Sequence, residues 1–307
     1  MTLAPEGPTR TEVHSGEVDA SPPPGREEQQ IRVAGGRVLL GASLFLGWVL
    51  LYLLVLSDFE QNHAQNVLYG ELRTQLAEGT APTGAPVDAG APVALLSIPA
   101  LDLDDLVVVE GTRSRQLQDG PGHRPGTVLP GQQGVSVVAG RSTSYGRPFA
   151  RLPELQRGAR VVVTTAQGQF TYLVSGLRRD GDPMPAAPAA GASRLTLVTA
   201  AGKGSRVSRL QASETVYVDA VLSSGAVASG PRSAADPRPE LLESHVDSAT
   251  LAELALALQL LLLTLAGFVW SWSRWSRRAA WIAGTPAVLA ALWLASSIGA
   301  RLLPALL

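Results

Sequence analysis

Three long apolar runs dominate the hydrophobic pattern of the chain, and each is long enough to cross a membrane as a helix. The first run, residues 38–56, reads VLLGASLFLGWVLLYLLVL without a charged side chain. The second and third runs cover residues 251–272 and 279–300. Since about 20 apolar residues of α-helix span the hydrocarbon core of a bilayer, the pattern predicts three transmembrane helices.

Charged residues on either side of these runs predict their orientation. Arg32 and Arg37 precede the first run, whereas Asp58 and Glu60 follow it. The loop between the second and third runs, residues 273–278, carries three arginines. Basic residues favour the cytoplasmic side of a membrane. We therefore predict a multi-pass cell-membrane protein with a cytoplasmic N-terminus, a cytoplasmic basic loop and an extracytoplasmic domain between its first and second spans.

The segments that flank the predicted spans lack the regular apolar period of packed elements. Residues 1–37 predict a disordered cytoplasmic tail, because Pro, Glu, Gly and Ser dominate most of it. Residues 57–92 predict a helical stalk followed by a flexible Gly/Ala/Pro linker, and residues 223–250 predict a second linker. Residues 301–307 are expected to form a short tail after the third span.

Residues 93–222 change to the short alternating runs that are typical of β-strands. The strand candidates are residues 94–98, 106–110, 134–140, 160–165, 169–175, 195–199 and 214–221. Residues 152–155 predict one helical turn. Short strands joined by Gly, Pro and Asp turns favour an antiparallel barrel or sandwich over a parallel α/β sheet.

Composition excludes several kinds of chemistry. The net charge of −1 argues against nucleic acid as a partner, and the chain contains no cysteine. Disulfides, thiolate metal sites and a thiol nucleophile are therefore excluded. Asp102, Asp104 and Asp105 fall in a turn between strands that suits solvent better than a cation. We predict neither a metal site nor a cofactor.

The stretch best placed to carry chemistry is LTLVTAAGKGSRVSRL at residues 195–210, where an alternating strand ends in a glycine loop. It follows, in order, IPALDLDDLVVVEGT at 98–112, LQDGPGHRPGTVLPGQQG at 117–134 and VSVVAGRSTSYGRPFARL at 135–152. Together these motifs resemble the sortase family, most closely the membrane-anchored class E type of Gram-positive bacteria. The resemblance covers about residues 93–222 and implies an all-β closed barrel of about eight strands with a short helix.

The resemblance also implies an activity that the residues here contradict. Sortases cut a surface-protein sorting signal with a cysteine, form a thioester and pass the protein to a cell-wall or pilin amine. The family's strand motif TLTTC reads TLVTA here, so Ala200 takes the place of the nucleophile, and AGHR reads AGRS, so Arg141 replaces the histidine. Only the catalytic arginine is retained, as Arg209. Without a thiol and an imidazole, no competent catalytic residue is expected.

Our leading interpretation is a catalytically inactive, membrane-anchored sortase-like protein that binds peptides. The candidate ligands are a surface-protein sorting signal, a cell-wall precursor and an active sortase. One hypothesis places a peptide carboxylate or a phosphate-bearing wall precursor between basic side chains of the groove. The residues proposed to bind are Arg141, Ser142, Thr199, Arg206 and Arg209. The simpler interpretation, which we favour for Arg141, leaves its side chain in solvent or paired with Asp180 or Asp182.

Two other function classes stay open. The chain could be a sortase-family hydrolase or transpeptidase that uses Ser142 or Thr199 as its nucleophile. A hydroxyl needs an adjacent base, however, and His123, the histidine nearest in sequence, lies outside the family's catalytic trio. The third class is a structural membrane protein whose barrel stabilises the three helices.

Overall fold

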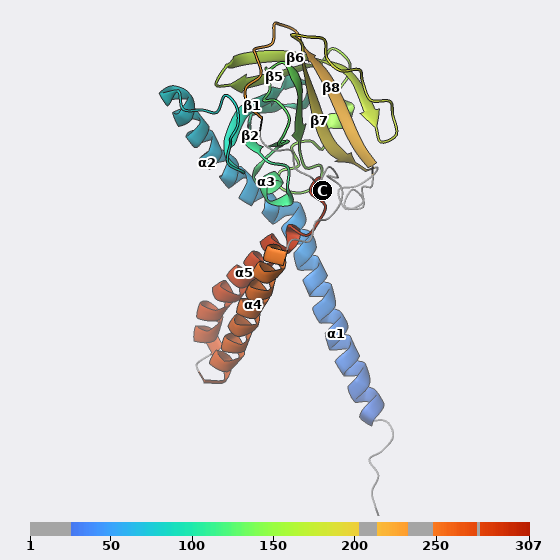
Figure 1. Ribbon diagram of the computed structural model, residues 1–307. Helices are drawn as coiled ribbons and strands as arrows, with labels where there is room; N and C mark the ends of the chain where they lie inside the picture. Colours follow the sequence, from blue (N-terminus) through green and yellow to red (C-terminus); the bar gives the residue numbers. More distant parts are fainter. Residues whose placement is uncertain (1–25, 203–213, 233–247, 275–276) are drawn as a thin grey trace, which may run out of the picture. The chain divides into compact units, whose positions relative to one another are not determined.

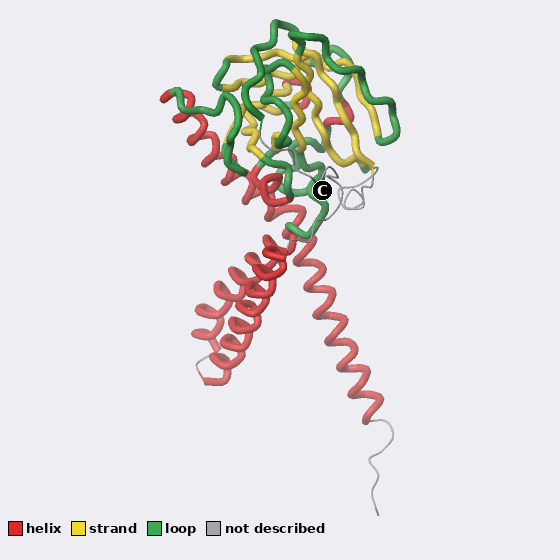
Figure 2. The backbone as a smooth tube through the Cα atoms, viewed as in Figure 1, coloured by secondary structure: helices red, strands yellow, loops and turns green. Residues whose placement is uncertain are grey.

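The computed structural model describes residues 26–202, 214–232, 248–274 and 277–307. Within these ranges, eight strands close a barrel in the order β1-β2-β3-β4-β7-β8-β6-β5 (Figures 1 and 2). The strands are β1 (Pro92–Ile98), β2 (Leu103–Glu110), β3 (Gly122–His123), β4 (Gly134–Ala139), β5 (Arg160–Thr165), β6 (Gly168–Arg179), β7 (Ser193–Ala201) and β8 (Glu214–Leu222). The predicted closed all-β barrel is confirmed.

Alternation along the strands fills the barrel interior with aliphatic side chains. On β1, Leu96 and Ile98 point inward and are fully buried, and on β7 Leu195 and Leu197 do the same. Full burial of such a side chain stabilises the fold by roughly 1.5–3 kcal/mol. Most neighbouring strands are antiparallel, as predicted, but β2 pairs in parallel with β3 and β4 in parallel with β7. Between β4 and β7 the chain forms β5 and β6. It then returns as β7 beside β4, running in the same direction as β4.

Helical elements lie between and beyond the strands. They are α1 (Arg26–Leu51), the π-helical turn η1 (Tyr52–Leu56), α2 (Ser57–Glu78), the 3-10 turn η2 (Pro99–Leu101), α3 (Ser114–Asp119), the 3-10 turn η3 (Leu152–Glu154), α4 (Ser248–Arg274) and α5 (Arg277–Ala300). The helical turn predicted at 152–155 is confirmed as η3. Neither α3 nor the two-residue β3 was predicted, since both are too short for a period to show.

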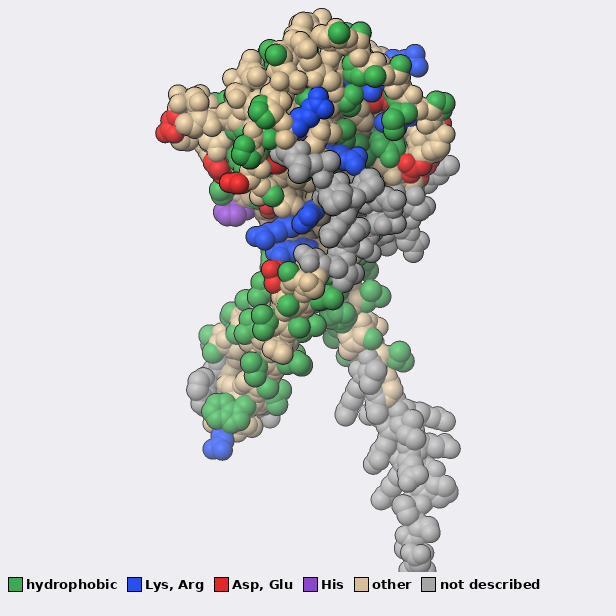
Figure 3. Space-filling view, in the orientation of Figure 1, with side chains coloured by type: hydrophobic (Ala, Val, Ile, Leu, Met, Phe, Trp, Pro, Cys, Tyr) green, Lys and Arg blue, Asp and Glu red, His purple; other side chains and the backbone are tan. Residues whose placement is uncertain are grey.

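Among the described residues, three helices are long and apolar enough to cross a membrane: Leu39–Glu78, Ser248–Arg274 and Ala280–Ala300. Apolar side chains are spread over the visible surface of α4 and α5, among backbone and other side chains drawn in tan (Figure 3). Leu262 and Leu263 on α4, for example, are 66% and 70% exposed. An apolar face that no protein covers is what a lipid-facing helix requires. The predicted orientation of these helices remains a prediction.

The predicted N-terminal tail is partly wrong. Residues 1–25 lie outside the described residues, but α1 already begins at Arg26, so residues 26–37 are helical rather than disordered. They contain good helix formers (Arg, Glu and Gln), which outweigh the two glycines at their end. The helical residues up to Gly47 form one unit, and Trp48–Leu307 forms a second compact unit.

The two predicted linkers are not free where the structure describes them. In residues 79–92, the carbonyl of Thr83 accepts a 2.8 Å hydrogen bond from Gln132 Nε2, and the Ala85 amide donates to the Pro231 carbonyl at 2.9 Å. In residues 223–232, the Gly230 amide donates to Gln132 Oε1 at 3.4 Å. Small residues made these segments look flexible, yet they also let the two backbones approach each other and the barrel.

The helix α2 packs along the barrel rather than standing away from it. The Gln65 side chain accepts from the Val107 amide at 2.8 Å and donates to the Asp119 carbonyl, also at 2.8 Å. Leu72 is fully buried in a cluster with Val107. This helix therefore fixes the position of β2 and of the end of α3, and it supports the loop described next.

Candidate functional site

The parallel strands β4 and β7 form the floor of a groove on the outside of the barrel. Their register sets Val137 opposite Thr196 and Ala139 opposite Val198. Because Leu195 and Leu197 of β7 point into the core, the alternate residues of that strand point outward. The floor residues are Val135, Val137 and Ala139 of β4 and Thr196, Val198 and Ala200 of β7.

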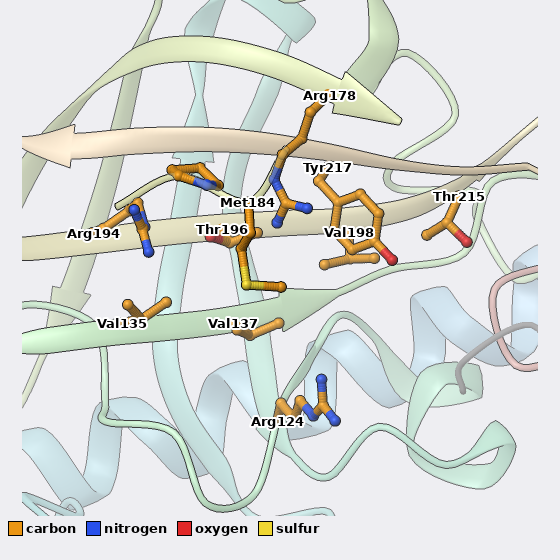
Figure 4. A pocket seen from close by; sticks show the side chains of 11 residues that line it. Arg124, Val135, Val137, Arg178, Met184, Arg194, Thr196, Val198, Thr215 and Tyr217 are labelled. Carbon is orange, nitrogen blue, oxygen red and sulfur yellow. The ribbon is translucent and has the colours of Figure 1, made fainter. Parts of the chain in front are cut away.

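One half of this groove, called the open half here, is a cavity of about 420 Å³. Val135, Val137, Thr196 and Val198 form its floor. Three arginines and one aromatic side chain stand around the floor: Arg124, Arg178, Arg194 and Tyr217. In Figure 4, Arg178 and Tyr217 lie together on one side of the floor, and Arg124 lies on the other. The open half thus combines an apolar base with basic walls.

A buried carboxylate holds the Arg178 wall in place. Asp219 lies beneath the open half and pairs with Arg178 Nε at 2.8 Å, while Thr196 donates to its other oxygen at 2.6 Å. The Arg178 guanidinium also lies over the Tyr217 ring, 4.1 Å from the centroid. Burial raises the pKa of the Tyr217 hydroxyl, and the nearby Asp180 carboxylate raises it further.

The other half of the groove, beside Ala200, is filled by the chain itself. We call it the occupied half, and the filling residues are the 303–307 segment, LPALL, which follows α5. Ala305, Leu306 and Leu307 pack in one apolar cluster with residues of the floor and of α3. The cluster partners are Leu117, Ala139, Val198 and Ala200. Leu306 and Leu307 are 0% and 4% exposed.

The loop after β4, residues 140–146, binds the backbone of this segment. The Leu306 carbonyl accepts from the Ser142 amide at 3.0 Å and from its hydroxyl at 3.2 Å. The Leu307 carbonyl accepts from the Ser144 amide at 3.1 Å and from its hydroxyl at 2.7 Å. Each of the two carbonyls therefore has two donors, from alternate residues of the 140–146 loop.

The helix α2 and the strand β7 hold the 140–146 loop in shape. The Tyr145 amide donates to Ser57 Oγ at 3.1 Å, and the Gly146 amide donates to Asp58 Oδ1 at 2.9 Å. Gly146 has a φ of +67°, and a Cβ there would overlap the side chain of Gln61. At the other end, Thr199 Oγ1 of β7 donates to the Gly140 carbonyl at 2.9 Å. The donors of the loop are therefore preorganised.

Arg141 is fully buried behind this loop. Its guanidinium donates to the Leu117 carbonyl at 3.1 Å, to Ser144 Oγ at 3.1 Å, and to the carbonyl and hydroxyl of Ser114 at 3.1 and 2.8 Å. It also lies 5.0 Å from the centroid of the Tyr145 ring. Burial lowers the pKa of Arg141 from 12.5 to about 10, and the Tyr145 hydroxyl opposes this change. The cation is solvated by neutral protein groups.

Both of our interpretations of Arg141 need correction. Its side chain is neither in solvent nor paired with an acid, because Asp180 accepts from the Thr215 amide and the Tyr217 hydroxyl, and Asp182 accepts from the Arg179 amide. It does not reach across the groove toward a ligand either, since its donors go to α3 and Ser144. The alternation of side chains along a strand predicts which face a residue lies on. It does not show that α3 provides backbone carbonyls to the buried guanidinium of Arg141.

The other proposed binding residues have different outcomes. Ser142 faces the groove and binds the 303–307 segment, whereas Thr199 is fully buried beneath the loop. Arg206 and Arg209 lie outside the described residues. His123 cannot serve Ser142 as a base, because its Nδ1 is 2.7 Å from Glu110 Oε2 and its Nε2 is 2.9 Å from the Val128 carbonyl. Our sequence reasoning missed Ser144 and the 303–307 segment, since no local pattern relates residues so distant in sequence.

Comparison with known proteins agrees with the barrel. Residues 96–220 match the family model described as the sortase domain. A sortase D of Bacillus subtilis (strain 168) is 31% identical over 85 residues, which are 28% of this chain and 41% of that protein. The match thus spans less than half of that relative's length. Residues 96–220 of this chain therefore form a sortase domain.

Solved structures of sortases are also similar to the chain. A Clostridium perfringens sortase D5 transpeptidase is 21% identical, with a TM-score of 0.44 over 53% of this chain and 99% of its own. The sortase E of Streptomyces avermitilis is 29% identical, with a TM-score of 0.36 over 45% of this chain and 92% of its own.

Proposed function

We propose that this chain is a membrane-anchored, extracytoplasmic sortase-like protein that binds peptides without cutting them. The observation that carries the proposal is the pair of side chains at the end of the groove. Ala200, the next-to-last residue of β7, offers only a methyl group. Arg141 places a buried guanidinium behind the 140–146 loop. The resemblance to sortases assigns these two positions to the cysteine and the histidine.

Neither side chain can replace the chemistry that the family uses. Acyl transfer through a covalent intermediate needs a nucleophile and a group that accepts and returns its proton. Alanine offers no nucleophile. With a pKa of about 10, Arg141 stays protonated at neutral pH and cannot act as a base there. Its donors are already used by Ser114, Leu117 and Ser144.

The groove still has what binding an extended peptide requires. It offers backbone and hydroxyl donors on the 140–146 loop, an apolar floor, and the basic walls of the open half. Main-chain hydrogen bonds supply affinity for an extended peptide, and pockets beside them supply selectivity. The three apolar helices support attachment to a lipid bilayer. Candidate partners are a surface-protein sorting signal, a cell-wall precursor and an active sortase.

The test uses the full chain in lipid nanodiscs with a sorting-signal peptide that carries a fluorophore and a quencher. We expect no cleavage above the rate of empty nanodiscs, together with measurable binding of the fluorescent peptide by anisotropy. Val137→Asp places a charge on the groove floor and should weaken binding at least tenfold. Val221→Asp, on an exposed position of β8, is the matched control and should bind like the wild type.

Turnover of the peptide by the wild-type chain would contradict the proposal. Loss of that turnover in Ser142→Ala or Thr199→Ala would then assign a hydroxyl nucleophile and establish the hydrolase or transpeptidase alternative. Binding that Val137→Asp and Val221→Asp affect equally would show that the groove is not the peptide site.

A further inference from the structure

We propose that the 303–307 segment is an internal ligand of the groove, which must leave the occupied half before a peptide from another protein binds there. The inference rests on the proposed function and names the regulation of that same site. It is drawn from the contacts of Leu306 and Leu307 with the 140–146 loop and with the floor beside Ala200.

The segment contacts the groove as a bound peptide would. The Ser142 and Ser144 amides donate to two successive carbonyls of the segment, which makes a turn with its Leu307 amide 3.1 Å from the Pro304 carbonyl. The side chains of Leu306 and Leu307 meanwhile lie against Ala139, Val198 and Ala200. Backbone donors and an apolar pocket act on the same two residues, so the contact has both components of peptide recognition.

The segment is an addition to the barrel rather than part of its core. The barrel interior forms one apolar cluster, and residues 305–307 belong to a separate cluster on the outer face of β4 and β7. Val137 and Val198 contribute to both the occupied half and the open half. The floor therefore continues beyond the segment, and a longer peptide would extend from one half into the other.

Arg141 serves as a positioning residue for this internal ligand. Its Nη1 donates to Ser144 Oγ at 3.1 Å, and that hydroxyl donates to the Leu307 carbonyl at 2.7 Å. Its Nε donates to the carbonyl of Leu117, whose side chain packs in the same cluster as Leu306 and Leu307. The guanidinium thus fixes a hydrogen-bond donor and an apolar wall of the occupied half without touching the ligand.

The covalent link to α5 makes the internal ligand a strong competitor. Ala300, the last residue of α5, packs with Tyr52 and Tyr145, and Arg301 pairs with Glu253 of α4 at 2.7 Å. These contacts hold the start of the segment next to the groove. A tethered ligand has an effective concentration in the millimolar range for a short linker, so a free peptide of the same sequence binds much more weakly.

A thiol placed at position 200 reports whether the groove is occupied, because the chain has no other cysteine. The A200C variant in nanodiscs is treated with a maleimide, and the labelling rate is measured by mass spectrometry. We expect the rate to rise at least tenfold when A200C is combined with Leu306→Asp. Leu302→Asp, at a partly exposed leucine of the same stretch, is the control and should leave the rate unchanged. Equal rates in A200C and A200C with Leu306→Asp would overturn the proposal.

A second measurement replaces residues 305–307 with Gly-Ser-Gly and adds the fluorescent peptide Leu-Leu-Pro-Ala-Leu-Leu in trans. We expect it to bind the replaced chain at least tenfold more tightly than the intact chain and to slow the labelling of A200C. Arg141→Lys keeps the positive charge but loses the fork of donors. Added to the A200C chain with residues 305–307 in place, it should make labelling faster than in A200C alone. The internal-ligand proposal would be overturned if the peptide bound the intact and the replaced chain equally. It would also be overturned if the replacement exposed the A200C thiol but no peptide bound.

The two proposals fail in different ways. If a sorting-signal peptide binds the intact and replaced chains equally and remains uncut, the internal ligand is refuted and the proposed binding function stands. If the replaced chain without an added cysteine cleaves that peptide while the intact chain does not, the segment is confirmed as an occupant and the proposed lack of catalysis is refuted.

Discussion

The two halves of the groove share one floor but differ in what stands on it. The occupied half is lined by small and aliphatic side chains and by neutral hydroxyls, and leucines of the same chain fill it. The open half is surrounded by Arg124, Arg178 and Arg194 and encloses a cavity. An apolar ligand therefore suits the first half, whereas an acidic or polar extension suits the second. A peptide that bound along the whole floor, as we propose, would therefore need two ends of different chemistry.

The largest effect is expected beneath the open half, where Asp219→Ala removes the partner of Arg178. Loss of one member of a buried, hydrogen-bonded ion pair costs about 3–5 kcal/mol, because the remaining charge stays buried without compensation. Arg178 is partly exposed, so we expect a value near the lower end, about 3 kcal/mol. Denaturant unfolding of the full chain in detergent measures it. Asp182→Ala, an exposed position, is the control and should change stability by less than about 0.5 kcal/mol.

Larger side chains on the floor should change stability differently in the two halves. Ala200→Leu overpacks the occupied half and should cost about 1–3 kcal/mol. Val135→Leu adds volume where the groove is open and should cost less than about 0.5 kcal/mol. Thermal unfolding of the two variants compares them. Similar losses in both would mean that the floor beside Ala200 is no more closely packed than the floor of the open half.

Ser144→Ala should weaken the occupied half alone. The hydroxyl bonds both Arg141 and the Leu307 carbonyl, so its removal leaves a buried donor without a partner and should cost about 1–3 kcal/mol. Ser142→Ala removes a longer bond to Leu306 and should cost about 1 kcal/mol or less. Hydrogen exchange of residues 303–307 by mass spectrometry measures both changes. Faster exchange in Ser142→Ala than in Ser144→Ala would contradict this order.

The smallest expected effect is the pH dependence contributed by Arg141. Its pKa is about 10 in the folded chain against an ordinary value of 12.5, so above about pH 10 the unfolded chain binds more protons. Stability contributed at this position therefore rises with pH there and is constant below it. Between pH 8 and pH 10, we expect the wild type to gain less than about 1 kcal/mol relative to Arg141→Met. A relative loss over that interval would show that the guanidinium is not desolvated.

Local patterns predicted the elements of this fold better than its long-range contacts. Residues 160–165 were predicted as a strand and form β5 with those bounds, because an apolar alternation between turns depends only on neighbours in sequence. The parallel pairing of β4 with β7 was not predicted, since it depends on how distant strands meet. The structure places Leu195 and Leu197 of β7 inward and Ala200 outward, a choice of face that alternation alone does not make.

The site itself was only partly predictable. The motif around Ala200 and Arg141 located the end of the groove, but it did not show that Arg141 is buried. Charged residues are almost never fully buried without partners, and the partners of Arg141 are backbone carbonyls and hydroxyls of α3 and the loop, which leave no charge pattern in the sequence. The 303–307 segment was predicted as a short tail, because nothing local indicates that residues so distant in sequence meet Ser142 and Ser144.

The hydrogen bonds around Gln132 have a mechanical consequence. They fasten the segment that enters the barrel to the segment that leaves it, through Thr83 and Gly230 as well as the direct bond between Ala85 and Pro231. Tension that pulls the 79–92 and 223–232 segments apart would load these bonds before it reached the strand ladders. The shape of the groove would therefore be preserved until these hydrogen bonds broke.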